Sequence, residues 1–288
     1  SAPRRLEPQL DLLRGRPELA GCGCGVRYFP DDLVRGGARR YEEWLNGLVE
    51  PAEIEAGVFV ECPLPHPTFF MRAAALEAVG GYRETAGPED YELILRMWSR
   101  GHGFGKVADV LLHWREGEDR LSRTDPRYAQ EAFLALKVEY LRRTLLVPDD
   151  VATVGRTHGV DAEPDPPGPH PSGPNASELR GVVIWGAGPV GKALSRALQD
   201  ADVAVAAFVA LDPRTIGQEI HGAPVLDTAD RRAMGAGGRR GVAPRARQAD
   251  RRSPLHLAAV GQEGARQRIN DLLEGAGKQP LRDFVAVA

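Results

Sequence analysis

Two adjacent carboxylates, Glu89 and Asp90, stand at the start of a strongly apolar segment. Apolar side chains recur through this segment at helical spacing, which predicts a helix over residues 90–100 that stops at Gly101. Acidic side chains in the first turn of a helix interact favourably with its dipole and its free amide groups. A carboxylate in such a place can also accept a proton from a hydroxyl group. Helix capping and proton transfer are therefore both open interpretations of this pair.

Polar residues on either side of the pair could also act on a substrate. His66 lies upstream on a loop that is constrained by a proline on each side. His113 and Arg115 flank Trp114 at the end of an apolar segment that predicts a strand over residues 107–113. A guanidinium such as that of Arg115 can pair with phosphate oxygens. The structural alternatives are a simple turn at His66, a strand-capping His113 and a core position for Trp114.

A glycine-rich turn in the second half of the chain is typical of phosphate binding. Gly186, Gly188 and Gly191 follow a predicted strand over 181–185 and precede a predicted helix over 192–199. Glycines there allow a tight turn and the close approach of a diphosphate to the helix N-terminus. A dinucleotide site also needs an acidic residue about 20 residues further on. That place holds no acidic residue, so a nucleotide site and a purely structural turn are both open.

The predicted elements divide into two groups on either side of a proline-rich stretch, residues 163–175, which holds six prolines and favours an extended spacer. The first group comprises helices over 5–13, 38–48, 73–79, 90–100 and 128–143, with strands over 22–29, 58–61, 69–71 and 107–113. The second comprises strands over 181–185, 203–209, 255–260 and 284–287, with helices over 192–199 and 264–273. We therefore expect an α/β domain over 1–146, a linker over 147–179 and a second α/β domain over 180–288.

One segment of the second domain does not fit this alternation. Residues 231–252 contain eight arginines and no aromatic residue. Single-stranded nucleic acid is usually bound by arginines interleaved with stacking aromatic side chains, so a nucleic-acid patch is disfavoured. A solvated loop or a locally altered reading frame accounts better for this composition.

Composition excludes several broad classes of protein. Hydrophobic residues make up 42% of the 288 residues and charged residues 27%, as in globular proteins, and the net charge is −3. No run approaches the roughly 18 apolar residues of a membrane span. The three cysteines, Cys22, Cys24 and Cys62, are too few for a disulfide framework and lack a second pair for zinc. We expect a cytoplasmic protein, free or peripheral at the inner membrane face, with no integral membrane segment and no nucleic-acid partner.

The order of motifs over residues 61–123 resembles a known family. The motifs are His66-Pro67-Thr68, the strand and helix of 69–79, Gly80-Gly81, Glu89-Asp90, Leu111–Glu116 and Arg120-Leu121-Ser122. In this order and spacing, residues 5–143 resemble the acceptor half of an inverting, family-2 glycosyltransferase with a GT-A fold. The resemblance implies a nucleotide-sugar donor and a hydroxyl-bearing acceptor, which is a glycan, a lipid-linked molecule or a small molecule. The expected fold class is α/β: a partial GT-A domain followed by a Rossmann-like domain.

The resemblance also assigns roles to residues. Asp90 is the implied catalytic base, and Glu89 is the neighbour that helps to orient the acceptor. His66, His113 and Arg115 are implied contacts to the acceptor or the donor. Gly186, Gly188 and Gly191 lie in a part that resembles the small nucleotide-binding-like domain of sugar-modifying acyltransferases and of some bacterial glycosyltransferases.

The family implies a divalent cation, magnesium or manganese, that is held by an Asp-x-Asp motif at the end of the donor-binding half. The opening residues 3–10 resemble the segment that follows that motif. We therefore expect the chain to lack the donor half, and its metal ligands are unknown. Three interpretations follow: a glycosyltransferase, a non-catalytic module that binds a nucleotide through the Rossmann-like domain, and a catalytically silent product of the same ancestry.

Overall fold

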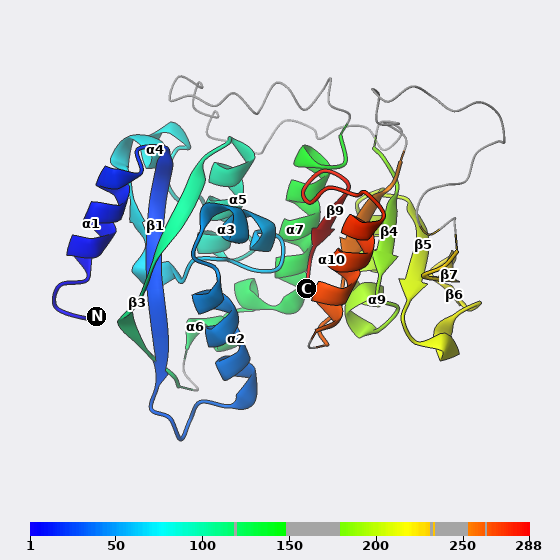
Figure 1. Ribbon diagram of the computed structural model, residues 1–288, viewed down its shortest axis with the longest axis horizontal. Coiled ribbons are helices and arrows are strands. Elements are labelled where there is room, and N and C mark those ends of the chain that lie inside the picture. The colour runs from blue at the N-terminus through cyan, green and yellow to red at the C-terminus, as the bar shows by residue number, and fades with distance from the viewer. Residues whose placement is uncertain (118–119, 148–178, 231–232, 234–252, 263) are drawn as a thin grey trace. The chain divides into compact units, whose positions relative to one another are not determined.

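The computed structural model describes residues 1–117, 120–147, 179–230, 233, 253–262 and 264–288. The chain forms two compact units, and the division falls after Leu136, within a helix. Both units are mixed α/β structures, which confirms the predicted class at that level (Figure 1). The expected linker over 147–179 lies almost wholly outside the described residues, as does most of the arginine-rich segment.

The first unit is built around a three-stranded sheet of order β2-β1-β3 (Figure 1). Strand β1 pairs antiparallel with the short β2 and parallel with the long β3. The elements are α1 (Leu6–Gly15), β1 (Leu19–Phe29), α2 (Gly36–Gly47), α3 (Pro51–Gly57), the 3₁₀ turn η1 (His66–Thr68), β2 (Phe70–Met71), α4 (Ala73–Ala78), α5 (Glu89–Ser99), β3 (Gly103–Arg115), α6 (Leu121–Thr124), the 3₁₀ turn η2 (Pro126–Tyr128) and α7 (Gln130–Thr144).

The turn η1 packs directly against the central strand because β1 has a glycine at the contact. A Cβ atom on Gly23 would lie 2.9 Å from Thr68 Oγ1, which is too close for any side chain. The buried Gln9 donates from Nε2 to the Thr68 carbonyl at 2.8 Å, and Thr68 Oγ1 donates to the Pro65 carbonyl at 2.7 Å. These contacts fix η1, and therefore His66, on the sheet.

Helix α5 is buried on nearly every side, from Tyr91 to Trp98. The buried stretch includes one charged pair, Glu92 and Arg96, and the helix is anchored by polar contacts at both ends. Tyr91 donates from its hydroxyl to the Val58 carbonyl at 2.7 Å, and Trp98 donates from Nε1 to Glu55 at 3.1 Å. The first two residues of this buried helix, Glu89 and Asp90, are only half-buried.

One predicted strand of the first unit is wrong. Residues 58–61 form turns after α3, a helix that the sequence prediction missed. Pro51 occupies the first helical turn, and Glu53 accepts a hydrogen bond from the Glu50 amide at 2.9 Å, which starts the helix. Val58 and Phe59 are buried, so their apolar character reflects burial and not strand pairing.

The second unit holds a six-stranded sheet of order β6-β7-β5-β4-β8-β9. All neighbouring strands are parallel except β6, which forms a hairpin with β7 through His221 and Gly222, both at positive φ. The elements are β4 (Val182–Trp185), α9 (Pro189–Asp200), β5 (Val205–Ala210), the turn η4 (Pro213–Thr215), β6 (Glu219–Ile220), β7 (Ala223–Asp227), β8 (Leu255–Ala258), α10 (Ala265–Gly275) and β9 (Phe284–Ala286). The β6–β7 hairpin was not predicted.

The parallel strands of this sheet run outward from β4 in two directions. The chain passes from β4 to β5 and β7 on one side, then returns to β8 and β9 on the other. The loops after β4 and β8 therefore lie side by side, at the position where open α/β sheets bind ligands. A Cβ atom on Gly186 would lie 2.5 Å from the Ala259 carbonyl, so these two loops are in contact. None of the described helices is long and apolar enough to cross a membrane.

The core of the second unit contains a histidine that should make its stability depend on pH. His256 is fully buried, accepts at Nδ1 from Trp185 Nε1 at 3.1 Å, and has no hydrogen-bond partner at Nε2 among the described residues. Burial lowers the pKa of His256 to about 4. The unfolded chain binds this proton near pH 6.5, so stability should fall as pH drops from about 6.5 to about 4, by roughly 3 kcal/mol.

Thermal unfolding between pH 4 and 8 measures this effect, and His256→Gln should flatten the curve. His102 in the first unit also has a pKa lowered by burial, so it contributes in the same direction. The variant His102→Gln therefore measures that contribution separately. Equal pH dependence in the wild type and in His256→Gln would contradict the assignment.

Candidate functional site

Glu89 and Asp90 are the first two residues of α5 and follow Pro88, which holds the N-cap position without a side-chain hydrogen bond. Asp90 Oδ1 accepts a hydrogen bond from the Tyr91 amide at 2.8 Å. One oxygen of Asp90 therefore satisfies a free amide in the first turn, although the N-cap itself is Pro88 and not an acidic residue. The other oxygen, Oδ2, lies 3.8 Å from His66 Nδ1.

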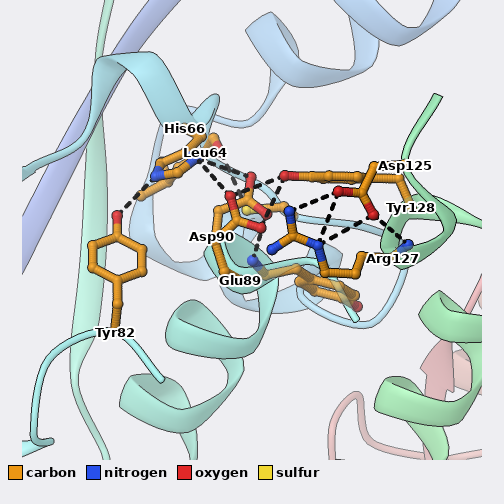
Figure 2. A network of polar contacts seen from close by, with 10 residues as sticks. Leu64, His66, Tyr82, Glu89, Asp90, Asp125, Arg127 and Tyr128 are labelled. Atoms are coloured by element: carbon orange, nitrogen blue, oxygen red, sulfur yellow. Dashed lines mark hydrogen bonds and ion pairs between the residues drawn. The ribbon is translucent and has the colours of Figure 1, made fainter. Parts of the chain in front are cut away.

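His66 joins the two carboxylates to a tyrosine on another loop. Its Nδ1 atom lies 3.9 Å from Glu89 Oε1, and its Nε2 atom is hydrogen-bonded to the Tyr82 hydroxyl at 2.8 Å. Figure 2 shows Glu89 and Asp90 near one edge of the imidazole ring and Tyr82 near the other. Distances near 3.9 Å are those of ion pairs and exceed hydrogen-bond length. The structure thus brings together three of the predicted site residues, His66, Glu89 and Asp90.

The two carboxylates differ in what holds them. Both oxygens of Glu89 lie 2.9 Å from the Tyr128 hydroxyl, which donates to this carboxylate (Figure 2). Tyr128 is held in turn by η2, where Asp125 accepts from the Arg127 amide and pairs with its guanidinium. Burial, and then the hydrogen bond to Glu89, raise the pKa of the Tyr128 hydroxyl well above its usual value. Glu89 is therefore held in place by a hydrogen bond from the Tyr128 hydroxyl, which stays protonated.

The surroundings of Asp90 shift its ionisation. Burial raises the pKa of Asp90, and the charge of Glu89 adds to that effect. His66 and the Tyr91 amide act in the opposite direction and lower the Asp90 pKa. A carboxylate with a raised pKa is a better proton acceptor than an ordinary aspartate. Two neighbouring carboxylates with different surroundings are a common arrangement where acid–base roles are divided.

Two cavities meet at this cluster. A cavity of about 740 Å³ contains Asp90 in its wall, with aromatic and charged side chains around it. A second cavity of about 780 Å³ contains Glu89 and Tyr82 in its wall. His66 lines both cavities. Asp90 and Glu89 thus face different spaces, which share the imidazole as a common wall.

A braced pair of arginines, Arg120 and Arg123, lines the cavity that contains Asp90. The buried Glu116 pairs with Arg120 at 3.2 Å and with Arg123 at 2.6 Å. The Arg120 guanidinium also lies over the rings of Tyr28 and Trp114, which stack on each other with centroids 5.2 Å apart. The sequence prediction missed these residues as site residues. The available signal was the Arg-Leu-Ser motif, which was noted without a role.

His113 and Arg115 are exposed and line neither cavity. Side chains alternate between the two faces of a strand, so Trp114 and Glu116 face the cavity while their neighbours His113 and Arg115 face away. The His113 ring contacts Phe29 in an edge-on arrangement. The structure therefore does not bring these two predicted residues to the carboxylate pair.

No set of three or more His, Cys, Asp or Glu side chains in the described ranges is arranged to hold a metal ion. The divalent cation stays a prediction, and its ligands are not identified. The three cysteines are free thiols and buried, as expected.

The glycine-rich turn of the second unit has the geometry that its spacing predicts. Gly186 has a φ of +121°, and a Cβ atom on Gly191 would lie 1.9 Å from the Gly186 carbonyl. A Cβ atom on Gly188 would meet nothing within 4 Å, so the turn is open at that point. Asp212, the acidic residue nearest to the expected ribose position, pairs with Arg214 at 2.7 Å. This pairing lowers the pKa of Asp212 to about 2.

Comparison with known proteins gives one informative similarity. No protein-family model matches the chain. The chain is 27% identical over 121 residues to the amylovoran biosynthesis glycosyltransferase AmsE of Erwinia amylovora, and the match covers 42% of this chain and 43% of that protein. The chain thus spans less than half the length of this curated relative. The chain therefore has a distant relationship to a glycosyltransferase.

Proposed function

We propose that the first unit is the acceptor half of an inverting, family-2 glycosyltransferase with a GT-A fold. The observation that carries the proposal is Asp90, a carboxylate with a raised pKa in the wall of a 740 Å³ cavity, 3.8 Å from an imidazole. The similarity to AmsE supports the same class of reaction. The substrates would be a nucleotide-sugar donor and an acceptor hydroxyl. The protein would work in the cytoplasm, free or at the inner membrane face.

In this proposal the acceptor hydroxyl enters the cavity beside Asp90. Its oxygen forms a bond to the anomeric carbon of the donor as the bond from that carbon to the diphosphate oxygen breaks, and Asp90 takes the hydroxyl proton. Attack from the face opposite the diphosphate inverts the anomeric centre. Glu89, held by Tyr128, would help to orient the part of the acceptor that extends into the neighbouring cavity. A bound divalent cation would supply charge stabilisation to the departing diphosphate.

Arg120 and Arg123 take the phosphate-binding role in this proposal. They line the cavity that contains Asp90, and an arginine fork can hold two phosphate oxygens at once. His113 and Arg115, which were the predicted contacts, are exposed on the other face of β3.

A thermal-shift screen against nucleotide-sugars, with and without manganese, tests the proposal. A ligand at about one hundred times its dissociation constant stabilises the folded state by roughly 2.7 kcal/mol, which is measurable. A shift with one nucleotide-sugar that is lost in Arg120→Gln supports the proposal. No shift with any nucleotide-sugar would contradict it.

A second candidate function belongs to the second unit, which we propose is a Rossmann-like nucleotide-binding domain. The specific observation in its favour concerns the space around the three glycines. A Cβ atom at Gly186 or Gly191 would collide with the backbone, whereas a Cβ atom at Gly188 would meet nothing within 4 Å. The chain in this case would be a non-catalytic nucleotide-binding module.

Two glycine variants separate a binding role from a structural one. Gly188 has φ −81° and open space around it, so Gly188→Val should leave the thermal unfolding midpoint unchanged and abolish binding of NAD(H) or nucleotide-sugars. Gly191→Ala should destabilise the unit because its methyl group would collide with the Gly186 carbonyl. Titration calorimetry with each ligand measures the first effect. Unchanged affinity in Gly188→Val would remove the ligand site from this turn.

A further inference from the structure

The His66 ring is held in one orientation from several sides. Its turn, η1, is fixed on the sheet by Gln9 and Thr68, as described above. The ring packs against Phe69 with centroids 5.0 Å apart and against Tyr82 with centroids 5.7 Å apart. The hydrogen bond to the Tyr82 hydroxyl fixes Nε2, so Nδ1 must face the two carboxylates.

Two partly buried carboxylates next to each other tend to retain a proton, and a nearby imidazole can oppose this tendency. Desolvation and mutual repulsion both favour a proton on one of them, and a base that carries a proton cannot accept another. Glu89 is already satisfied by the Tyr128 hydroxyl. Asp90 has one oxygen on the Tyr91 amide, and its other oxygen faces His66. The imidazole, when protonated, is thus the group placed to favour the ionised form of Asp90.

We propose that His66, oriented by Tyr82, is a positioning residue that keeps Asp90 ionised and directs its free oxygen toward the 740 Å³ cavity. This inference rests on the proposed function of Asp90 as the base. His66 does not itself touch the transferred proton in this role. Tyr82 acts indirectly, through His66, because its hydroxyl fixes which ring nitrogen faces the carboxylates.

Other ionisable groups surround the carboxylate pair and His66. The other charged and titratable groups that line the two cavities with Asp90 and His66 are Tyr28, Tyr41, Glu61, Cys62, Tyr82, Arg83, Glu84, Glu89, Glu116, Arg120, Arg123, Arg127 and Tyr128. Burial, and then Asp90, raise the pKa of Tyr82 to about 12, so its hydroxyl is neutral at working pH. Burial keeps the pKa of the Cys62 thiol well above its usual value, so this thiol is neutral as well.

The test is a carboxyl carbon NMR titration of Asp90 in the full chain with labelled aspartate. His66→Gln should raise the Asp90 pKa, and Tyr82→Phe should raise it by a smaller amount because the ring loses its orientation. Glu89→Gln should lower it, because the neighbouring negative charge is gone. His102→Gln, at the far end of α5, is the matched control and should leave it unchanged. An unchanged or lowered Asp90 pKa in a folded His66→Gln protein would overturn the inference.

A second readout separates positioning from a merely structural role. In a transfer assay, His66→Gln should move the acidic limb of the pH–rate profile to higher pH, with the rate recovering at alkaline pH. A structural role would lower the rate equally at all pH values. The NMR result does not depend on activity. A shifted Asp90 pKa together with full activity in Asp90→Asn would therefore retain the coupling and reject the proposed function.

Discussion

Asp90→Asn is expected to lower the rate of glycosyl transfer by about a hundredfold to ten-thousandfold, the usual contribution of a general base. Asparagine keeps the oxygen that accepts from the Tyr91 amide, so the start of α5 should be preserved. It also removes a buried charge, so the unfolding temperature should be unchanged or higher. The measurement is release of nucleoside diphosphate from the donor. Retained activity would remove Asp90 from the role of base.

Glu89→Gln is the matched control for this prediction. Glutamine can still accept from the Tyr128 hydroxyl through its amide oxygen, so the site should keep its shape. We expect a smaller loss than for Asp90→Asn, since Glu89 faces the other cavity. A larger loss in Glu89→Gln would exchange the roles of the two carboxylates.

The pH dependence of transfer follows from the ionisation of Asp90. The base must be ionised, and its pKa is raised by burial. The rate should therefore fall as pH drops through that pKa, and this limb should lie at higher pH than for an exposed aspartate. The acidic limb should be absent from the residual rate of Asp90→Asn.

The second large effect is expected in Arg96→Met, which should destabilise the first unit by about 3–5 kcal/mol. Arg96 is almost completely buried and forms two hydrogen bonds to Glu92, at 2.9 Å and 2.8 Å. It also donates to the carbonyls of Val79 and Gly81, which lead into the loop that carries Tyr82. The variant leaves Glu92 buried without its main counter-charge. Urea denaturation followed by tryptophan fluorescence measures the change.

Two further variants show whether burial is the cause. Arg4 and Glu7 form an exposed ion pair at 2.7 Å, and Arg4→Met should cost less than about 1 kcal/mol. Combining Arg96→Met with Glu92→Leu should recover part of the lost stability, because no uncompensated charge is left inside. Equal effects of Arg4→Met and Arg96→Met would show that the buried pair is not a major contribution.

The sequence was sufficient to predict the elements whose signals are local. The apolar spacing after Glu89 predicted α5 within one residue at either end, and the glycine pattern predicted the turn from β4 into α9. These features depend on contacts within one or two helical turns or on backbone freedom at a single glycine. The strand expected over 58–61 was wrong because that prediction also depended on the local pattern alone. An apolar pair, Val58 and Phe59, has no local feature that separates a buried turn from a strand.

The site itself depends on contacts between distant parts of the sequence. Tyr128 lies 39 residues from Glu89, and Tyr82 lies 16 residues from His66, so no local pattern relates them. The alternation along β3, continued at the next residue, separates His113 and Arg115 from Trp114 and Glu116. Which of the two faces lines a cavity is decided by the packing of other elements.

By itself, the sequence determined the α/β class, the carboxylate pair at a helix start and the glycine turn, and it allowed several roles for each. Only the tertiary structure decided that Glu89 is held by Tyr128 while Asp90 faces a cavity beside His66. It also assigned Arg120 and Arg123 to that cavity in place of the predicted His113 and Arg115. The physical reason is that desolvation and charge pairing, which set the ionisation of a carboxylate, arise from side chains that only folding brings together.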